Sequence, residues 1–278
     1  MNKTDFEELQ RLSPEEHSIW NAAVSHYVNS LIKRDLLFDD GMAAIKNQLE
    51  DAETSPDLAN LQIPIELRKI LLAAAPIYRK HWWKAHDTQN QLWISQLNPL
   101  VEQHGSEICN DLARIYEEPW PQYPVRVDAV AYANWAGAYT TLEPTRPTIS
   151  TTDPTNQGAA ALEILFHETS HGMMNKVRDA IDAAEKAANA KTIGSPLRFR
   201  GSLWHEVLFY TSGELVAERV RGYTPYANKN GLWARAWTGP DYVLIERDWK
   251  PHMNGRVTLS AALTNLVDDL VTASSPHH

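Results

Sequence analysis

The spacing of apolar residues predicts helices over most of the first 115 positions. Trp20, Val24, Tyr27 and Leu31 recur three or four positions apart, which is the spacing of one helix face. The sequence SPEE at 13–16 precedes them. It supplies a serine N-cap, a proline at the first helical position and a glutamate that closes a capping box. We therefore expect a helix that begins at this point.

The same periodicity continues through three further segments before the pattern changes. Residues 41–52 continue the helical spacing, and Pro64 opens an apolar helix that runs to about residue 83. Another helix is expected over 98–118, with a break at Gly105, because glycine weakens a helix interior.

A proline-rich segment at 117–124 marks a turn or a linker, since proline stops helices. Residues 125–141 follow it. They are rich in Val, Ala, Tyr and Thr with partial alternation, which predicts a strand, and 148–153 predicts a second short strand. Gly137 within the first of these suggests a bulge or a close approach of another backbone.

The remainder of the chain again favours helices. A long helix is expected over 157–191, interrupted near Gly172, and another over 202–222. A tryptophan-rich segment at 233–249 is expected to be loop, and the last helix covers 257–271.

These elements together predict a mostly helical α+β protein with a small β-sheet. The shift in composition suggests a helical region over 1–120 and a second region over 121–278, which are also compatible with one compact domain.

Composition excludes several classes of protein. The 278 residues carry a net charge of −9 and no cluster of Lys and Arg, which argues against a nucleic-acid partner. The one cysteine rules out a disulfide within the chain. The longest apolar stretch, 70–78, is too short to span a bilayer. The first 17 residues contain no signal-peptide core, so the compartment stays open between the cytoplasm and export with the leader absent from this sequence.

The segment HETSH at 167–171 is the strongest indication of chemistry. His167 and His171 lie four positions apart, on one face of a helix, where two imidazoles can converge on one metal. Glu168 projects beside them and can take a proton from a water bound to that metal. The alternative is a pair of ordinary buried histidines, but two histidines and a glutamate on one apolar helix are costly without a metal or partners. The pattern predicts a hydrolytic Zn²⁺ site.

HETSH resembles the H-E-x-x-H motif of the zincin metallopeptidases. The longer motif of one zincin branch, the metzincins, does not fit, because Met174 and Val177 stand where that motif has glycine and histidine. The order of a strand pair, the motif helix and a second helix instead resembles the gluzincins. This resemblance implies a zincin-like catalytic core, with a third metal ligand on the second helix.

The gluzincin resemblance also implies that an edge strand binds the substrate backbone in extended form. The segment assigned to that role is 134–141, with Trp135, Gly137 and Tyr139 as candidate substrate-binding residues.

Three residues of the second helix are candidates for the third ligand: His205, Glu206 and Glu214. Gluzincins typically use a glutamate. We favour His205, because it lies on an apolar face with Phe209 and a neutral imidazole is the least costly polar ligand to bury. If His205 is the ligand, the site departs from the gluzincin pattern.

Acyl transfer also needs a hydrogen-bond donor for the developing oxyanion. Gluzincins commonly supply a Tyr or a His, and Tyr223 just after the second helix is the candidate, with Tyr226 and Tyr139 as alternatives.

The predicted function is a zinc-dependent hydrolase, a metallopeptidase that acts on a peptide or protein substrate. The alternatives are a non-catalytic zinc-binding protein, a metal-free helical interaction module, and a metal-dependent amidase or esterase.

Overall fold

The computed structural model describes residues 2–36, 38–52, 58–121, 124–191, 197, 199, 201–237 and 241–274. Over these residues the protein is mostly helical, with one small three-stranded mixed sheet, so the α+β prediction is confirmed at that level. Within the same residues, no helix is both long and apolar enough to cross a membrane.

The first part of the chain consists of helices, as the periodicity predicted. The serine, proline and glutamate at the start of α2 form the expected capping box, with both reciprocal hydrogen bonds present. Two π-helical turns, Tyr27–Leu31 and Arg79–Trp83, extend α2 and join α4 to α5. The helices of this part are α1 Lys3–Leu9, α2 Pro14–His26, α3 Asp40–Asp51, α4 Ile65–Tyr78 and α5 Lys84–Tyr116.

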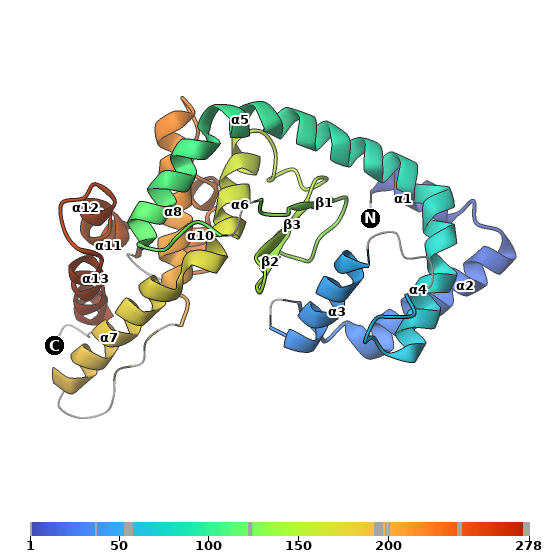
Figure 1. Ribbon diagram of the computed structural model, residues 1–278, viewed down its shortest axis with the longest axis horizontal. Coiled ribbons are helices and arrows are strands. Elements are labelled where there is room, and N and C mark those ends of the chain that lie inside the picture. Colours follow the sequence, from blue (N-terminus) through green and yellow to red (C-terminus); the bar gives the residue numbers. More distant parts are fainter. Residues whose placement is uncertain are drawn as a thin grey trace.

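Helix α5 contradicts the expected break at Gly105. It runs unbroken through Pro99 and Gly105 and links α1–α4 to the rest of the protein (Figure 1). Gly105 is buried, and a Cβ built there would lie 3.7 Å from the ring of Phe166 on a neighbouring helix. Tertiary packing against that helix thus offsets the roughly 1 kcal/mol that a glycine costs in a helix interior.

The sheet has the strand order β1-β3-β2, with β1 parallel and β2 antiparallel to the central strand. Its strands are β1 Asp128–Val130, β2 Ala138–Thr141 and β3 Arg146–Ser150. The single strand predicted over 125–141 is wrong: β1 and β2 are separate and do not pair with each other. Gly137 has φ +80°, where a side chain is strained, and ends the irregular stretch between them.

The second half supplies the helices around the sheet. The chain leaves the α-helical conformation at residues 171–174, where the interruption near Gly172 was predicted, and forms a 3₁₀ turn there. The expected loop at 233–249 is wrong, since most of its described residues are helical. The elements are α6 Ala159–Ser170, a 3₁₀ turn His171–Met173, α7 Asn175–Lys191, α8 Leu203–Arg219, α9 Tyr226–Lys229, α10 Leu232–Arg235, α11 Asp241–Asp248, α12 Lys250–Met253 and α13 Leu259–Ser274.

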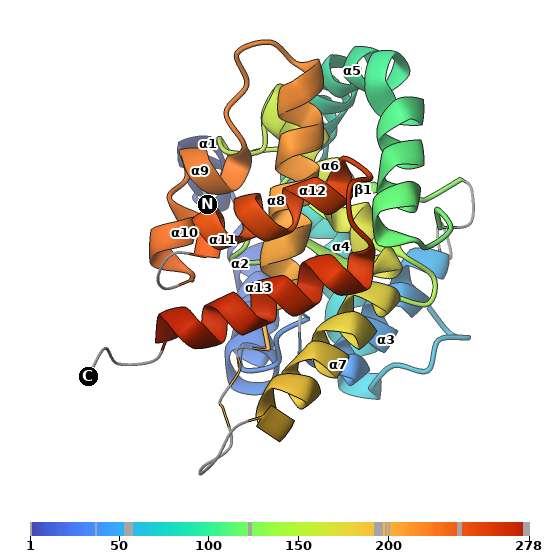
Figure 2. The same ribbon diagram turned by 90° about the vertical axis from the view of Figure 1, so that its left-hand side faces the viewer.

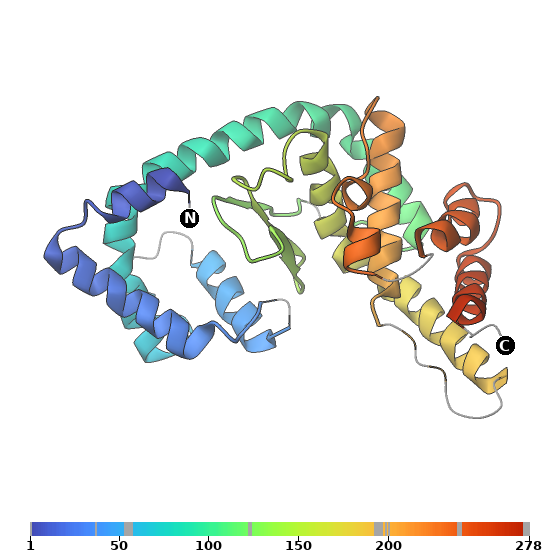
Figure 3. The same cartoon turned by 180° about the vertical axis from the view of Figure 1, so that it is seen from behind.

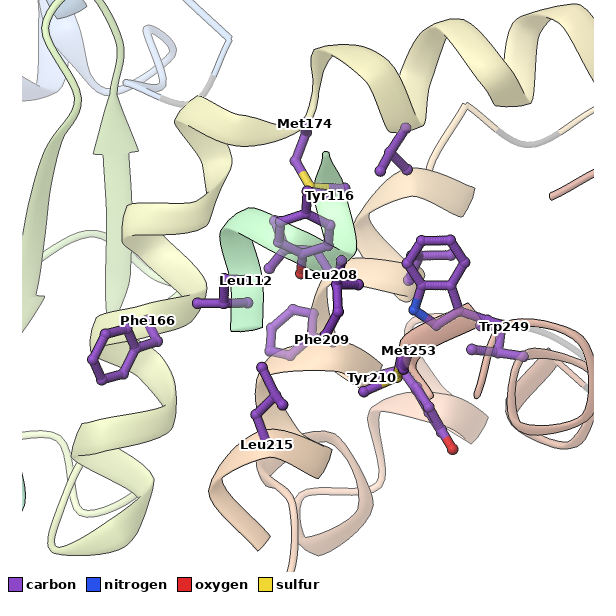
Figure 4. Packing of buried hydrophobic residues seen from close by; sticks show 14 of the residues in the cluster. Leu112, Tyr116, Phe166, Met174, Leu208, Phe209, Tyr210, Leu215, Trp249 and Met253 are labelled. Carbon is purple, nitrogen blue, oxygen red and sulfur yellow. The ribbon is translucent and has the colours of Figure 1, made fainter. Parts of the chain in front are cut away.

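The largest hydrophobic core lies where α5, α6, α8 and the C-terminal helices meet (Figure 4). Leu112 and Tyr116 of α5 are fully buried in it beside Leu208 of α8. Trp249 is fully buried as well, and its indole N–H donates to the Thr211 hydroxyl at 2.8 Å. The end of α5 therefore shares its core with the region after residue 121.

The remaining helices lie around this core. Helices α7 and α13 pack against each other (Figure 2), while α1–α4 lie toward the other end of the molecule, with the sheet between them and the helices of the second half (Figure 3). Smaller apolar clusters hold α1–α4 together.

Candidate metal centre

Helices α6 and α8 pack side by side and bring three histidines to one point. His167 lies in the last turn of α6, and His171 follows one turn later at the start of the 3₁₀ segment. His205 lies in the first turn of α8. Both helices are apolar and mostly buried, so the core that packs them also fixes the three imidazoles.

The three Nε2 atoms are spaced as the ligands of one metal ion. Nε2 of His167 lies 3.2 Å from that of His205 and 3.3 Å from that of His171. All three ligand atoms lie within 4.8 Å of one another. Tetrahedral zinc with Zn–N bonds of about 2.0–2.1 Å separates its nitrogens by about 3.3–3.4 Å. The donor type and the spacing both fit such an ion.

Burial keeps these histidines neutral. Desolvation is the main cause in each case: it holds the pKa of His167 well below its usual value and lowers those of His171 and His205 to about 3 and about 4. Coulombic interactions with His205 and Arg178 lower the pKa of His171 further. The charge of Arg178 does the same for His205. A neutral imidazole has a free lone pair on one ring nitrogen, which is the form that binds a metal.

His167 departs from the usual environment of a ligating histidine. Metal-bound imidazoles generally donate their second ring N–H to a carboxylate or a carbonyl. Nδ1 of His167 is buried and has no hydrogen-bond partner among the described residues. The ring packs on Phe209 instead, with centroids 3.8 Å apart. Packing rather than hydrogen bonding therefore orients this imidazole.

Glu168 lies at the edge of the histidine cluster. Its Oε2 is 3.9 Å from Nε2 of His171 and 2.7 Å from the hydroxyl of Thr140 on β2. Burial raises the pKa of Glu168 to about 7, and the Thr140 hydroxyl opposes that shift. A carboxyl group with a pKa near neutrality, beside a metal site, is suited to exchange protons.

The two glutamates considered as alternative third ligands lie elsewhere. Glu206 is fully buried, and its Oε1 accepts a hydrogen bond from the Ser202 hydroxyl at 3.1 Å. Glu214 pairs with Lys250 of α12 at 2.7 Å. Of these three candidates on α8, the structure brings only His205 to the other histidines.

Tyr223 is not among the residues that line the pocket, and its hydroxyl is bound to a buried carboxylate, Glu163, one helical turn before His167. The Tyr223 hydroxyl and the backbone N–H of Tyr226 both donate to Oε2 of Glu163, at 2.7 and 2.8 Å. Burial raises the pKa of Glu163 to about 7 despite these donors. In the sequence, Glu163 stands four residues before His167 and therefore on the same face of α6. That spacing could have indicated a buried carboxylate near the histidines.

Tyr226, unlike Tyr223, lines the pocket at the histidines. Its ring stacks on Phe209 at 6.2 Å, and its hydroxyl lies 3.0 Å from that of Thr155.

A pocket of about 350 Å³ opens onto the three histidines and Glu168. Of the candidate substrate-binding residues, Trp135 and Tyr139 line it, whereas Gly137 does not. A Cβ at Gly137 would lie 2.5 Å from a carboxylate oxygen of Asp153, so that position requires glycine for the local backbone. The other lining residues are Phe38, Ala136, Ala138, Thr140, Leu142, Ile164, Arg178, Trp204, Phe209 and Tyr226.

The strand that borders the pocket, β2, is one of the two edge strands of the sheet. Thr140 pairs with Pro147, which has no N–H, while Ser150 N–H donates to the carbonyl of Gly137. Because hydrogen-bonded and non-hydrogen-bonded pairs alternate along antiparallel strands, the backbone groups of Ala138 and Thr140 point away from β3. These two residues line the pocket, so β2 presents to it backbone donors and acceptors that have no partner among the described residues.

Two further pocket residues escaped the sequence reasoning. Thr140 lies inside the segment expected to bind substrate, but nothing in the sequence pairs it with Glu168. Arg178 lies on α7, beyond the helix break, so periodicity along α6 does not predict its direction.

Comparisons of this chain with known protein families, with curated proteins and with solved structures found no match.

Proposed function

We propose that the protein is a zinc-dependent hydrolase that cleaves peptide bonds. The observation that carries this proposal is the convergence of three neutral imidazoles, at the spacing of tetrahedral zinc ligands, beside the carboxylate of Glu168. His167, His171 and His205 would hold the ion.

Held by these ligands, a zinc ion would supply Lewis-acid chemistry: it would polarise a carbonyl and make a water molecule more acidic. Glu168 accepts the proton of the attacking water at its carboxylate and later returns it to the leaving amine. Thr140 fixes the orientation of that carboxylate through the hydroxyl 2.7 Å from Oε2. The apolar walls formed by Phe209 and Trp204 keep bulk water from the reacting groups.

The number of protein ligands favours a catalytic over a purely structural role. Structural zinc sites close four protein ligands around the metal, whereas catalytic sites use three. In the part of the chain that the structure describes, the cluster contains three ligands and no fourth. Glu168 stands aside from it, 3.9 Å from the nearest histidine nitrogen.

The pocket and the edge strand support an extended peptide as the substrate. The outward-facing backbone groups of Ala138 and Thr140 would pair with the substrate backbone, as in strand addition to a sheet edge. The exposed rings of Phe38 and Trp135 at the pocket would contact its side chains.

A zincin-like catalytic core is part of this proposal. The order of strand pair, motif helix and second helix supports it, while a histidine in place of the gluzincin glutamate sets the site apart. Of the two tyrosines that closely follow α8, Tyr223 and Tyr226, the second lines the pocket.

The test is hydrolysis of a peptide library by the zinc-loaded protein, with cleavage read by mass spectrometry. We expect cleavage by the wild type and a loss of roughly 10²-fold or more in Glu168→Gln, which keeps the shape of the side chain but cannot act as the base. Glu218→Gln, at an exposed position on α8, is the matched control. Cleavage that survives in Glu168→Gln would refute the proposed mechanism, and cleavage of esters or amides alone would change the substrate class.

A further inference from the structure

Arg178 places a cation at the same pocket as the three histidines. It extends from the first turn of α7, and its guanidinium lies over the indole of Trp204, 3.8 Å from the ring centroid. Among the described residues that line the pocket, it is the one Lys or Arg side chain. Stacking on an indole holds the planar guanidinium in one orientation.

This guanidinium has no counter-charge among the described residues. Several other arginines of the protein are paired with carboxylates, among them Arg219 with Asp111 and Arg146 with Glu50. Arg178 has neither an ion pair nor a donated hydrogen bond there, and its Nε is buried without a partner. A partly buried cation without a partner is costly, so its position calls for an anion from outside.

The distance to the histidine cluster limits where that anion lies on a peptide. Trp204 is 5.5 Å from His171 and 5.1 Å from His205, centroid to centroid. With the guanidinium centre 3.8 Å from Trp204, it lies no more than about 9 Å from either histidine ring. An extended chain advances about 3.3 Å per residue, so this distance corresponds to one to three residues.

We propose that Arg178 is a specificity-determining residue that binds a carboxylate of the substrate near the cleaved bond. Two sources carry that chemistry: the free C-terminus of a short peptide, and an Asp or Glu side chain. The planar fork of arginine pairs with either carboxylate through two parallel hydrogen bonds. This inference rests on the proposed function for its reaction, but the carboxylate site can be tested without turnover.

The probes are three N-acetylated pentapeptides of alanine, leucine and glutamine. The first is a neutral C-terminal amide, the second is the corresponding free acid, and the third is the amide with glutamate in place of glutamine. Hydrolysis of each is followed with the zinc-loaded protein. Binding of each is measured by calorimetry with zinc-loaded Glu168→Gln, so that the carboxylate site is tested even if nothing is cleaved.

We expect kcat/KM or affinity to be roughly 10- to 100-fold higher for at least one carboxylate peptide than for the neutral amide. The preferred peptide identifies the source of the carboxylate. Arg178→Ala abolishes the preference, so that the carboxylate peptides fall to the value of the neutral amide, while Arg178→Lys retains part of the preference, since lysine keeps the charge without the fork. Lys186→Ala, which removes an exposed charge from the same helix, keeps the full preference.

Three results would overturn the inference. The first two are the absence of any carboxylate preference and a preference that survives in Arg178→Ala at wild-type rates. The third is an equal loss for all three peptides in Arg178→Ala, because it would show that Arg178 only supports Trp204. Arg178-dependent binding without hydrolysis would leave the inference standing and refute the proposed function. Hydrolysis without a carboxylate preference would support the proposed function and refute the role of Arg178.

Discussion

Glu163 makes the stability of the protein depend on pH in a direction that the structure fixes. This carboxyl group is fully buried on α6, and burial raises its pKa from 4.5 to about 7. Between these two values the folded chain keeps the proton and the unfolded chain loses it. The folded state then binds more protons, so the free energy of unfolding falls as the pH rises through this window.

The size of the effect follows from the shift. Each pKa unit corresponds to about 1.4 kcal/mol, so Glu163 removes about 2 to 3 kcal/mol of stability between pH 5 and pH 8. Glu163→Gln remains neutral at both pH values and can still accept the hydrogen bond that Tyr223 donates. Relative to the wild type, this variant should therefore gain about 2 to 3 kcal/mol over the same pH interval.

The assay is urea denaturation at pH 5 and pH 8, followed by tryptophan fluorescence, with a chelator present so that metal binding does not contribute. Glu218 of α8 gives the matched control Glu218→Gln, because its exposed carboxylate is solvated in the folded and the unfolded chain. A difference between wild type and Glu163→Gln that stays constant within about 0.5 kcal/mol would refute the reasoning.

Three further predictions concern the histidine cluster and the packing of α8. Thr140→Val removes the hydrogen bond to Glu168, so kcat should fall roughly 10-fold while the zinc content stays unchanged. Steady-state kinetics and metal analysis measure these two quantities, and an unchanged kcat would contradict the role given to Thr140. Gly213→Ala places a Cβ 2.8 Å from the side chain of Pro225 and should destabilise the protein by about 1–3 kcal/mol, as measured by thermal denaturation. A variant as stable as the wild type would contradict this close packing. Zinc at 100 times its Kd should add about 2.7 kcal/mol to the free energy of unfolding of the wild type and nothing to His205→Ala; equal stabilisation of both would exclude His205 as a ligand.

The sequence predicted the elements that carry the histidines because their signals are local. The spacing of His167 and His171 is a property of one helix, and α8 has its own apolar pattern. The histidine on that apolar face was favoured as the third ligand on the cost of burial, and the structure places it 3.2 Å from its neighbour.

Features that depend on tertiary contacts were not predictable. Helix α5 stays intact at Gly105 because a neighbouring helix packs there, which a local propensity cannot register. The hydroxyl of Tyr223 is engaged by Glu163, 60 residues earlier in the chain. Arg178 reaches the pocket because the chain changes direction after α6. Beyond such a turn, the spacing of residues along α6 no longer predicts which way a side chain of α7 points.

Metal content tests the central claim most directly. Protein purified without a nickel column and dialysed against a trace of zinc would be analysed by mass spectrometry for bound metal, as wild type, His167→Ala, His205→Ala and Glu168→Gln. His104→Ala, which alters a histidine of α5 outside the cluster, is the control. We predict one zinc per chain in the wild type, Glu168→Gln and the control, and none in the two histidine variants. A wild type without stoichiometric metal, or zinc retained by both histidine variants, would contradict the account.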